Sequence, residues 1–513
     1  MPLAGPAPRS GGGFLARCRR RVLEAARMSA LAFPDRFVWG AATAAYQIEG
    51  AATLGGRGAS IWDMLCDKAG AIYGGHDGAV ASDHYRRYAQ DVALFRQLGL
   101  GGYRFSVSWP RVLPTGVGRP NPEGIAFYDR LVDALLAAGI EPYVTLFHWD
   151  LPLDLYHRGG WLNPDVSHWF AEYTSLVVEA LGDRVSNWMT LNEPQVFVGH
   201  GHYDGRHAPG LQYSLGEMLR CGHNALLAHG RCVSAIRAAS RVPARIGFAP
   251  MGFPKLPASE SPADIAAARE LMYSVAQPNH WNLTWWADPV LLGQYPEDGL
   301  RLFGKDAPRA SSADMEIIAA PTDFLGLNIY QGVFVRAGAD AKPEVVKTPA
   351  GFPLSAFNWP VTPEALYWGP LFAYERYRKP ILITENGLSC RDWPSLDGRV
   401  HDAQRIDFLT RHIRQLHRAV AACVPLEGYF HWSALDNFEW ADGFKERFGL
   451  IYVDYASGER IPKDSYHWYG KIIASNGRVA LGDEALLAHR TDFEADHGAA
   501  LEAMRGADAP STS

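Results

Sequence analysis

Eight short apolar runs recur along the chain, and several are separated by stretches whose apolar residues follow a helical spacing. Residues 83–98 and 121–138 have this spacing, and each stretch is followed by a glycine, Gly99 or Gly139, which is a typical helix stop signal. Near-continuous apolar strands that alternate with helices favour a parallel sheet covered by helices. The eight runs are residues 37–43, 103–109, 143–149, 187–193, 245–250, 324–330, 380–385 and 426–435.

The number of these runs favours one architecture within the α/β class. Eight parallel strands are typical of a closed (β/α)8 barrel, the TIM barrel, rather than an open doubly wound sheet. No Gly-x-Gly-x-x-Gly sequence follows the first run, which weakens the dinucleotide-binding alternative. No Pro- or Ser-rich linker divides residues 31 to about 475. We therefore predict a single barrel domain over residues 31–478, with long βα loops.

The two ends of the chain differ from this central part. Residues 1–30 combine a glycine run with the basic segment 17–21 and lack the apolar stretch of a secretory signal. We predict that they are a disordered or mis-started leader, with Met28 as a second candidate start; a basic transit segment stays open. Residues 479–513, rich in Ala, Glu, Asp and Gly, are predicted to form a weakly ordered tail.

Composition excludes several classes of protein. The net charge of −6 argues against nucleic-acid binding. No apolar run reaches transmembrane length, so no membrane partner is expected. The six cysteines are scattered without a C-x-x-C pair, which is typical of free thiols and predicts a cytoplasmic protein.

Polar and aromatic residues collect where the predicted strands end. The active sites of (β/α)8 barrels lie at the C-terminal ends of the strands. The agreement between strand ends and polar residues therefore indicates a single site at one end of the barrel. The residues at these ends are Gln47, Glu49, Arg104, His148, Trp149, Asn192, Glu193, Asn328, Tyr330, Glu385 and Trp432.

Two of these residues are glutamates in similar settings. Glu193 lies in the sequence TLNEP and Glu385 in the sequence ITENG, so each ends an apolar run and precedes a chain breaker. A buried carboxylate needs a partner or a shifted pKa. A pair of carboxylates in one cleft is what glycoside hydrolysis requires, as one acid and one nucleophile or base. The residues alone leave the two roles interchangeable, and carboxylates that merely cap barrel turns are the structural alternative.

Six sequence blocks then occur in an order that resembles glycoside hydrolase family 1, the β-glucosidases and their relatives. They are FVWGAATAAYQIEGA at 37–51, YRFSVSWPR at 103–111, LFHWDLP at 146–152, NEP at 192–194, TENG at 384–387 and WSALDNFEW at 432–440. The match runs from about residue 37 to residue 469.

The resemblance implies a role for each matching residue. Glu193 corresponds to the general acid/base and Glu385 to the nucleophile, with Arg104 and Asn328 supporting the nucleophile. Trp149 and Trp359 correspond to the leaving-group subsite. The resemblance implies no metal and no cofactor. The residues that correspond to the binding site of the innermost sugar are Gln47, His148, Asn192, Tyr330, Trp432, Glu439, Trp440 and Phe448.

The expected function is that of a retaining β-glycosidase acting on terminal non-reducing β-D-glucosyl residues by double displacement. β-Galactosides and β-fucosides are further expected substrates, and cellulose or other polysaccharide degradation is the expected context. The partners would be small β-glycosides or short β-linked oligosaccharides, and a homo-oligomer is left open. The two carboxyl groups of a retaining enzyme are expected about 5–5.5 Å apart.

Alternatives stay open at this point. A 6-phospho-β-glycosidase of the same family is disfavoured because Glu439 would repel a phosphate. A second alternative is a sugar-binding protein without catalytic activity, but no catalytic residue is missing from the sequence to favour it. Transglycosylation is a variant of the leading hypothesis. Three histidines at 200, 202 and 207 could indicate a metal site, but ordinary loop histidines are favoured because no second ligand cluster accompanies them.

Overall fold

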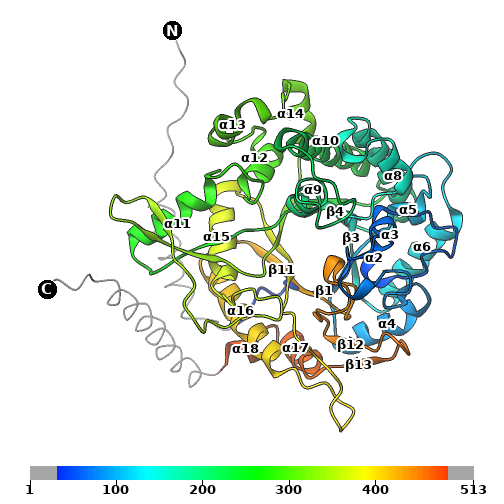
Figure 1. Cartoon of the computed structure of the whole chain (residues 1–513). Coiled ribbons are helices and arrows are strands. Elements are labelled where there is room, and N and C mark those ends of the chain that lie inside the picture. Colours follow the sequence, from blue (N-terminus) through cyan, green and yellow to red (C-terminus); the bar gives the residue numbers. More distant parts are fainter. Residues whose placement is uncertain (1–31, 483–513) are drawn as a thin grey trace.

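The computed structural model describes residues 32–482 (Figure 1). The predicted leader at 1–30 lies outside the described residues, and so does all of the predicted tail after residue 482. A short helix, α18 (Arg478–Leu481), spans the predicted boundary between barrel and tail at residue 479.

Eight parallel strands form a closed barrel, in the order β1-β11-β10-β7-β5-β4-β3-β2. Each strand falls within or overlaps one of the eight apolar runs, so the predicted (β/α)8 fold and its strand positions are confirmed. The barrel strands are β1 (Val38–Ala42), β2 (Gly102–Ser106), β3 (Glu141–Phe147), β4 (Asn187–Asn192), β5 (Arg245–Ala249), β7 (Phe324–Asn328), β10 (Ile381–Asn386) and β11 (Leu426–Trp432).

The barrel interior is packed with side chains, and the closing strands approach closely. A Cβ atom on Gly40 of β1 would lie 2.4 Å from the Phe430 ring and 2.8 Å from the Gly102 carbonyl oxygen. Phe430 in turn packs against Tyr143, with ring centroids 4.8 Å apart. Glycine at position 40 therefore leaves the space that the Phe430 ring fills where the first and last strands meet.

Helices surround the barrel in Figure 1, with at least one between successive strands of the barrel. The two helices predicted from spacing are present, and Gly99 ends the first of them in the left-handed conformation at φ 84°. The helices are α2 (Ala45–Ile48), α3 (Ile61–Cys66), α4 (His84–Leu98), α5 (Trp109–Val112), α6 (Pro122–Ala137), α7 (Leu153–His157), α8 (Val166–Leu181), α9 (Pro194–His202), α10 (Leu215–Ala239), α11 (Pro262–Tyr273), α12 (Thr284–Leu292), α13 (Glu297–Phe303), α14 (Ser312–Ile318), α15 (Ala365–Tyr377), α16 (Ala403–Ala421), α17 (Asp464–Ala474) and α18.

The long loops after the barrel strands carry structure of their own. The loops after β5 and β7 contribute a three-stranded sheet, and the loop after β11 forms an antiparallel pair. None of the helices within residues 32–482 combines the length and the apolar character needed to cross a membrane. The small strands are β6 (Lys255–Pro257), β8 (Val333–Ala337) and β9 (Pro343–Val345) in the sheet, and β12 (Ile451–Val453) and β13 (Arg460–Pro462) in the pair.

Candidate active site

Glu193 lies directly after β4, at the point where the strand turns into α9. Its backbone is left-handed, with φ 43° and ψ 68°, and Pro194 occupies the first position of the helix. Its backbone N–H donates to the carbonyl of Ala249 at the end of β5, at 2.9 Å. A non-glycine residue in this conformation is strained, and such strain is concentrated at functional sites. The turn holds a buried glutamate at the carboxyl end of the barrel.

Glu385 lies near the end of β10 and is also buried. Each of its two carboxylate oxygens accepts a hydrogen bond, one from Arg104 and the other from Tyr330. The Arg104 guanidinium of β2 donates to Oε1 at 2.6 Å, and the Tyr330 hydroxyl donates to Oε2 at 2.7 Å. An arginine cation and a phenol both favour the ionised form of a carboxyl group.

Two asparagines connect the strands that carry the glutamates. Asn328, at the end of β7, donates from Nδ2 to Oε1 of Glu193 at 2.8 Å and to Oδ1 of Asn192 at 3.0 Å. Its Oδ1 accepts from the hydroxyl of Thr384, the residue before Glu385, at 2.6 Å. Arg104 donates to Asn192 Oδ1 at 2.7 Å as well as to Glu385. The two glutamates therefore belong to one hydrogen-bonded cluster.

The electrostatics of the two carboxyl groups differ. Burial and the neighbouring Glu385 charge raise the pKa of Glu193 to about 8, against a hydrogen bond from Asn328 and the charge of Arg104. Burial also raises the pKa of Glu385, but the Arg104 charge and the hydrogen bonds from Tyr330 and Arg104 oppose the rise. The direct cation contact belongs to Glu385 alone of the two. At neutral pH this arrangement places the proton on Glu193 and the negative charge on Glu385.

His148, at the end of β3, is held as a neutral ring. Burial and the Arg104 charge lower the pKa of His148 well below its usual value. Asn192 Oδ1 already accepts from Arg104 and Asn328, so its Nδ2 is the atom 3.0 Å from His148 Nε2. This assigns the proton of the ring to Nδ1. That atom has no hydrogen-bond partner among the described residues.

Gln47, in the short helix α2, is buried and has an acceptor atom without a partner among the described residues, whereas His148 has a donor atom without one. The Gln47 Nε2 donates to Asn437 Oδ1 at 3.0 Å, to the Phe438 carbonyl at 2.8 Å and to Glu439 Oε2 at 3.3 Å. Its Oε1 has no hydrogen-bond partner within residues 32–482. Burial and the charges of Asp442 and Glu385 raise the pKa of Glu439 well above its usual value.

Aromatic rings surround these polar groups. Trp432 lies nearly parallel to the His148 ring, with centroids 5.7 Å apart and planes at 21°. Trp440 packs against Trp149 at 4.6 Å, and Trp149 donates from Nε1 to the Asn192 carbonyl at 2.9 Å. These residues lie directly after β3 and at the end of β11 and in its loop, so the fold brings together predicted positions that are far apart in the sequence.

The second group of rings includes one that the sequence did not predict. The ring centroid of Trp359 lies 5.3 Å from that of Tyr330, and the ring centroid of Phe448 lies 6.0 Å from that of Tyr330. Phe357 stacks on Trp359, with centroids 4.7 Å apart and planes at 8°. The predicted leaving-group residues are thus divided, with Trp359 beside the Tyr330 side of the site and Trp149 beside Trp440. The only sequence signal for Phe357 was its position two residues before Trp359.

The three histidines considered as metal ligands have other surroundings. His202 Nδ1 is 3.0 Å from the Phe197 carbonyl, His200 Nδ1 is 2.6 Å from Asp204, and His207 packs against Trp149 at 5.6 Å. Within the described part of the chain, no group of three or more His, Cys, Asp or Glu residues is arranged to hold a metal ion.

Comparison with known proteins agrees with this geometry. The model of "Glycosyl hydrolase family 1" matches residues 29–478. The chain belongs to glycosyl hydrolase family 1. The resemblance seen in the sequence blocks is therefore confirmed, and the chain is a glycoside hydrolase.

Similar proteins within the family are bacterial enzymes matched over nearly their whole length. β-Glucosidase A of Thermotoga maritima is 44% identical over 451 residues, which is 88% of this chain and 99% of the relative. The bifunctional β-D-glucosidase/β-D-fucosidase of Bifidobacterium breve is 39% identical over 470 residues, 86% of this chain and 98% of the relative. The solved structure of the Thermotoga maritima β-glucosidase in complex with castanospermine has a TM-score of 0.80, covering 87% of this chain and 99% of that one.

Proposed function

We propose that this family 1 glycoside hydrolase is a retaining β-glucosidase in which Glu385 is the nucleophile and Glu193 the general acid/base. The observation that carries the assignment is the unequal environment of the two carboxyl groups. Arg104 and Tyr330 hold both oxygens of Glu385, whereas Glu193 has an amide donor and a pKa raised to about 8. A nucleophile must be ionised and an acid must be protonated.

In the first step, an electron pair of Glu385 attacks the anomeric carbon while the bond to the leaving oxygen breaks. Glu193 gives its proton to that oxygen, so the alcohol departs neutral and the sugar becomes esterified to Glu385. In the second step, Glu193 removes a proton from water, the water oxygen bonds to the anomeric carbon, and Glu385 leaves as a carboxylate. Two inversions retain the β configuration.

The change in charge lets Glu193 serve in both steps. While Glu385 is ionised, its charge raises the pKa of Glu193 and keeps the proton in place. Once Glu385 is an ester, that charge is absent, and Glu193 can ionise and act as the base. The same residue pair therefore changes its protonation in step with the reaction.

Recognition of the sugar is assigned to the groups left without partners. The His148 Nδ1–H would donate to one hydroxyl, and Gln47 Oε1 would accept from another. Trp432 provides an apolar face, as a platform for the C–H side of the ring. Glu439 is an acidic side chain hydrogen-bonded to Gln47 and offers no cation to bind a phosphate, so we propose free rather than 6-phosphorylated glucosides as substrates.

The remaining parts of the proposal concern range and context. We propose small β-glucosides and short β-linked oligosaccharides as substrates, with β-fucosides as further ones, since a relative named for both activities covers 86% of this chain. We assign residues 31–478 to the catalytic domain. Cys66, Cys221, Cys232 and Cys390 form no disulfide, which agrees with a cytoplasmic location.

The test separates the two glutamates by the products of azide rescue. With an aryl β-glucoside, Glu385→Gly should lose hydrolysis by more than about 10⁴-fold, because the covalent step is removed. Azide should restore turnover by filling the cavity and giving the α-glucosyl azide. With Glu193→Gly and an activated aryl leaving group, the ester still forms, and azide should give the β-glucosyl azide.

The anomeric configuration of the two azides, read by NMR, decides the roles. The opposite pattern would exchange the nucleophile and the acid/base. Undiminished hydrolysis by Glu385→Gly would end the retaining assignment. Absence of activity in the parent enzyme on aryl β-glucosides would end the substrate assignment.

A further inference from the structure

Asn437 is a buried residue in the loop after β11 whose side chain is hydrogen-bonded to Gln47, one of the residues proposed to bind the sugar. Its Nδ2 donates to the Leu435 carbonyl at 3.0 Å and to the Ser433 hydroxyl at 2.9 Å. Its Oδ1 accepts from Gln47 Nε2 at 3.0 Å. A backbone carbonyl can only accept, so Leu435 fixes which end of the Asn437 amide carries the nitrogen.

The orientation of the Asn437 amide also determines which way the Gln47 amide points. Asn437 presents an oxygen to Gln47, and the Phe438 carbonyl presents a second oxygen at 2.8 Å. Together with Glu439 Oε2 at 3.3 Å, these oxygens require the nitrogen of the Gln47 amide at this position, and Oε1 has no partner among residues 32–482. Without the Asn437 oxygen, the Phe438 carbonyl would be the one short acceptor left, with Glu439 Oε2 at 3.3 Å as a weaker second. The Gln47 amide would then be held less firmly and could rotate to present a donor to the sugar.

We propose that Asn437 is a positioning residue that fixes the Gln47 amide so that its Oε1 faces the substrate. This inference rests on the proposed β-glucosidase function, since its effect is read as turnover of a β-glucoside. Asn437 contacts neither catalytic glutamate, and its action on the reaction passes through Gln47.

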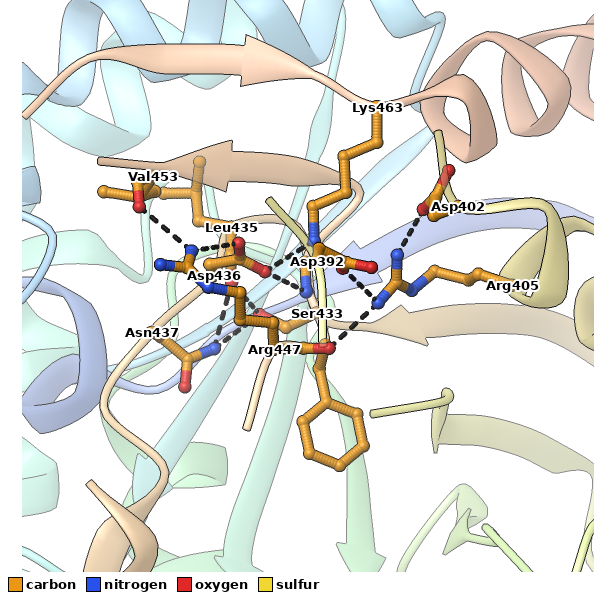
Figure 2. A network of polar contacts seen from close by, with 12 residues as sticks. Asp392, Asp402, Arg405, Ser433, Leu435, Asp436, Asn437, Arg447, Val453 and Lys463 are labelled. Atoms are coloured by element: carbon orange, nitrogen blue, oxygen red, sulfur yellow. Dashed lines mark hydrogen bonds and ion pairs between the residues drawn. The ribbon is translucent and has the colours of Figure 1, made fainter. Parts of the chain in front are cut away.

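A buried cluster of charges holds the backbone on which Asn437 depends (Figure 2). Asp436, the preceding residue, accepts at Oδ1 from Lys463 at 2.7 Å and from the Gly449 N–H at 2.9 Å. Its Oδ2 accepts from Arg447 at 2.6 Å. The side chains of Asp436 and Lys463 are both fully buried. Ionic hydrogen bonds of this kind are stronger than neutral ones, so the loop is tightly fixed beside Asn437.

The cluster continues toward the strand that carries Glu385. Lys463 also donates to Asp392 at 2.6 Å, in the loop after β10, and Asp392 accepts from Arg405 at 2.7 Å. Arg405 donates to Asp402 and to the Arg447 carbonyl, as Figure 2 shows. Lys463 therefore connects the loop after β10 to the loop after β11. Asn437, in the second of these loops, contacts Gln47 directly.

A double-mutant cycle distinguishes positioning from simple structural support. The variants are Asn437→Ala, Gln47→Ala and the double variant, compared with the parent by kcat/KM on an aryl β-glucoside. We expect Asn437→Ala to lose about tenfold, the effect of about one misplaced hydrogen bond. If Asn437 acts through Gln47, the double variant should match Gln47→Ala within about twofold.

A matched control tests whether loss of any buried asparagine has this effect. Asn224 is buried and donates from Nδ2 to the Trp161 and Leu162 carbonyls, at 2.9 and 3.3 Å. Asn224→Ala should lower the unfolding temperature, as Asn437→Ala should, but leave kcat/KM within about twofold of the parent. Should Asn437→Ala fail to fold, Asn437→Ser serves in the same cycle, because serine is too short to reach Gln47 yet keeps a hydroxyl in the polar site.

Two results would overturn the inference. One is a double variant whose loss equals the product of the two single losses, because the residues would then act independently. The other is a kcat/KM of Asn437→Ala within about twofold of the parent. Either result leaves the proposed function standing if the parent hydrolyses the glucoside, whereas an inactive parent contradicts the proposed function itself.

Discussion

At the scale of single residues, the division of roles that we propose between Glu193 and Glu385 depends on their neighbours rather than on their own sequence settings. Both glutamates end a strand and precede a chain breaker. The difference lies in Arg104 and Tyr330, which come from β2 and from the loop after β7 and both contact Glu385. These contacts are long-range, so the residue pattern around either glutamate does not contain them.

The pKa of Glu193 leads to a prediction about pH. Glu193 must be protonated for the first step, and its pKa is raised to about 8. Activity should therefore be present below that pH and decline as the pH rises through about 8, in the profile of kcat/KM. In Glu385→Gln the neighbouring charge is gone, so the pKa of Glu193 should fall but stay above its ordinary value because burial remains.

The measurement uses NMR of ¹³C-labelled glutamate carboxyl groups, with the Glu193 signal assigned by its loss in Glu193→Gln. Titration of the parent and of Glu385→Gln gives the two pKa values. If both proteins gave the same Glu193 pKa, burial alone would explain the raised value and the charge coupling between the two glutamates would be wrong.

Some residues of the site could be predicted from sequence and others could not. Gln47, His148, Asn192 and Glu439 matched family blocks, and the first three of them also lie near predicted strand ends. Their roles in the reaction stay predictions. Asn437 lies in the same block as Glu439, but its role depends on which way two amides point, and that is decided by backbone carbonyls in the folded loop.

At the scale of elements, the barrel strands were predictable because each is a buried apolar run of ordinary length. The small strands in the loops were not. The sheet formed by β6, β8 and β9 joins segments from two different βα loops, and β9 is only three residues long and partly exposed. Short exposed strands carry little apolar pattern, and their pairing depends on where the barrel places the loop ends.

The join between β10 and β11 gives a prediction at this scale. A Cβ atom on Gly387, just after β10, would lie 1.7 Å from the carbonyl oxygen of Trp432. Gly387→Ala must displace either the strand end that carries Glu385 or the Trp432 platform. We expect kcat/KM on an aryl β-glucoside to fall about tenfold or more, with about 1–3 kcal/mol of lost stability.

Gly470→Ala is the matched control for this substitution. Its Cβ in α17 would have its nearest neighbours, atoms of Leu98, at 3.5 Å, an ordinary contact distance. Alanine is the better helix former by up to about 1 kcal/mol, so activity should be unchanged and stability equal or higher. Parent-like activity of Gly387→Ala would show that the β10–β11 join tolerates movement and does not set the site geometry.

At the scale of the whole molecule, the buried charge cluster connects the C-terminal part of the chain to the barrel. Lys463 precedes α17, Arg405 lies in α16, and Asp436 follows β11. The cluster has three cations, Lys463, Arg405 and Arg447, and three anions, Asp392, Asp402 and Asp436. Because these charges balance, the cost of burying them is offset only while every member is present.

This balance leads to a prediction about stability. Lys463→Met leaves two cations facing three anions, so one buried charge is uncompensated. The free energy of unfolding should fall by about 3–5 kcal/mol, measured by denaturant unfolding at pH 7. Arg301→Ala removes an ion pair with Glu297 whose side chains are 72% and 87% exposed, and should change stability by less than about 0.5 kcal/mol. Adding Asp436→Asn to Lys463→Met restores two cations against two anions, so the double variant should be more stable than Lys463→Met alone. A double variant that is less stable still would mean that individual hydrogen bonds, and not the balance of charge, hold this part of the molecule together.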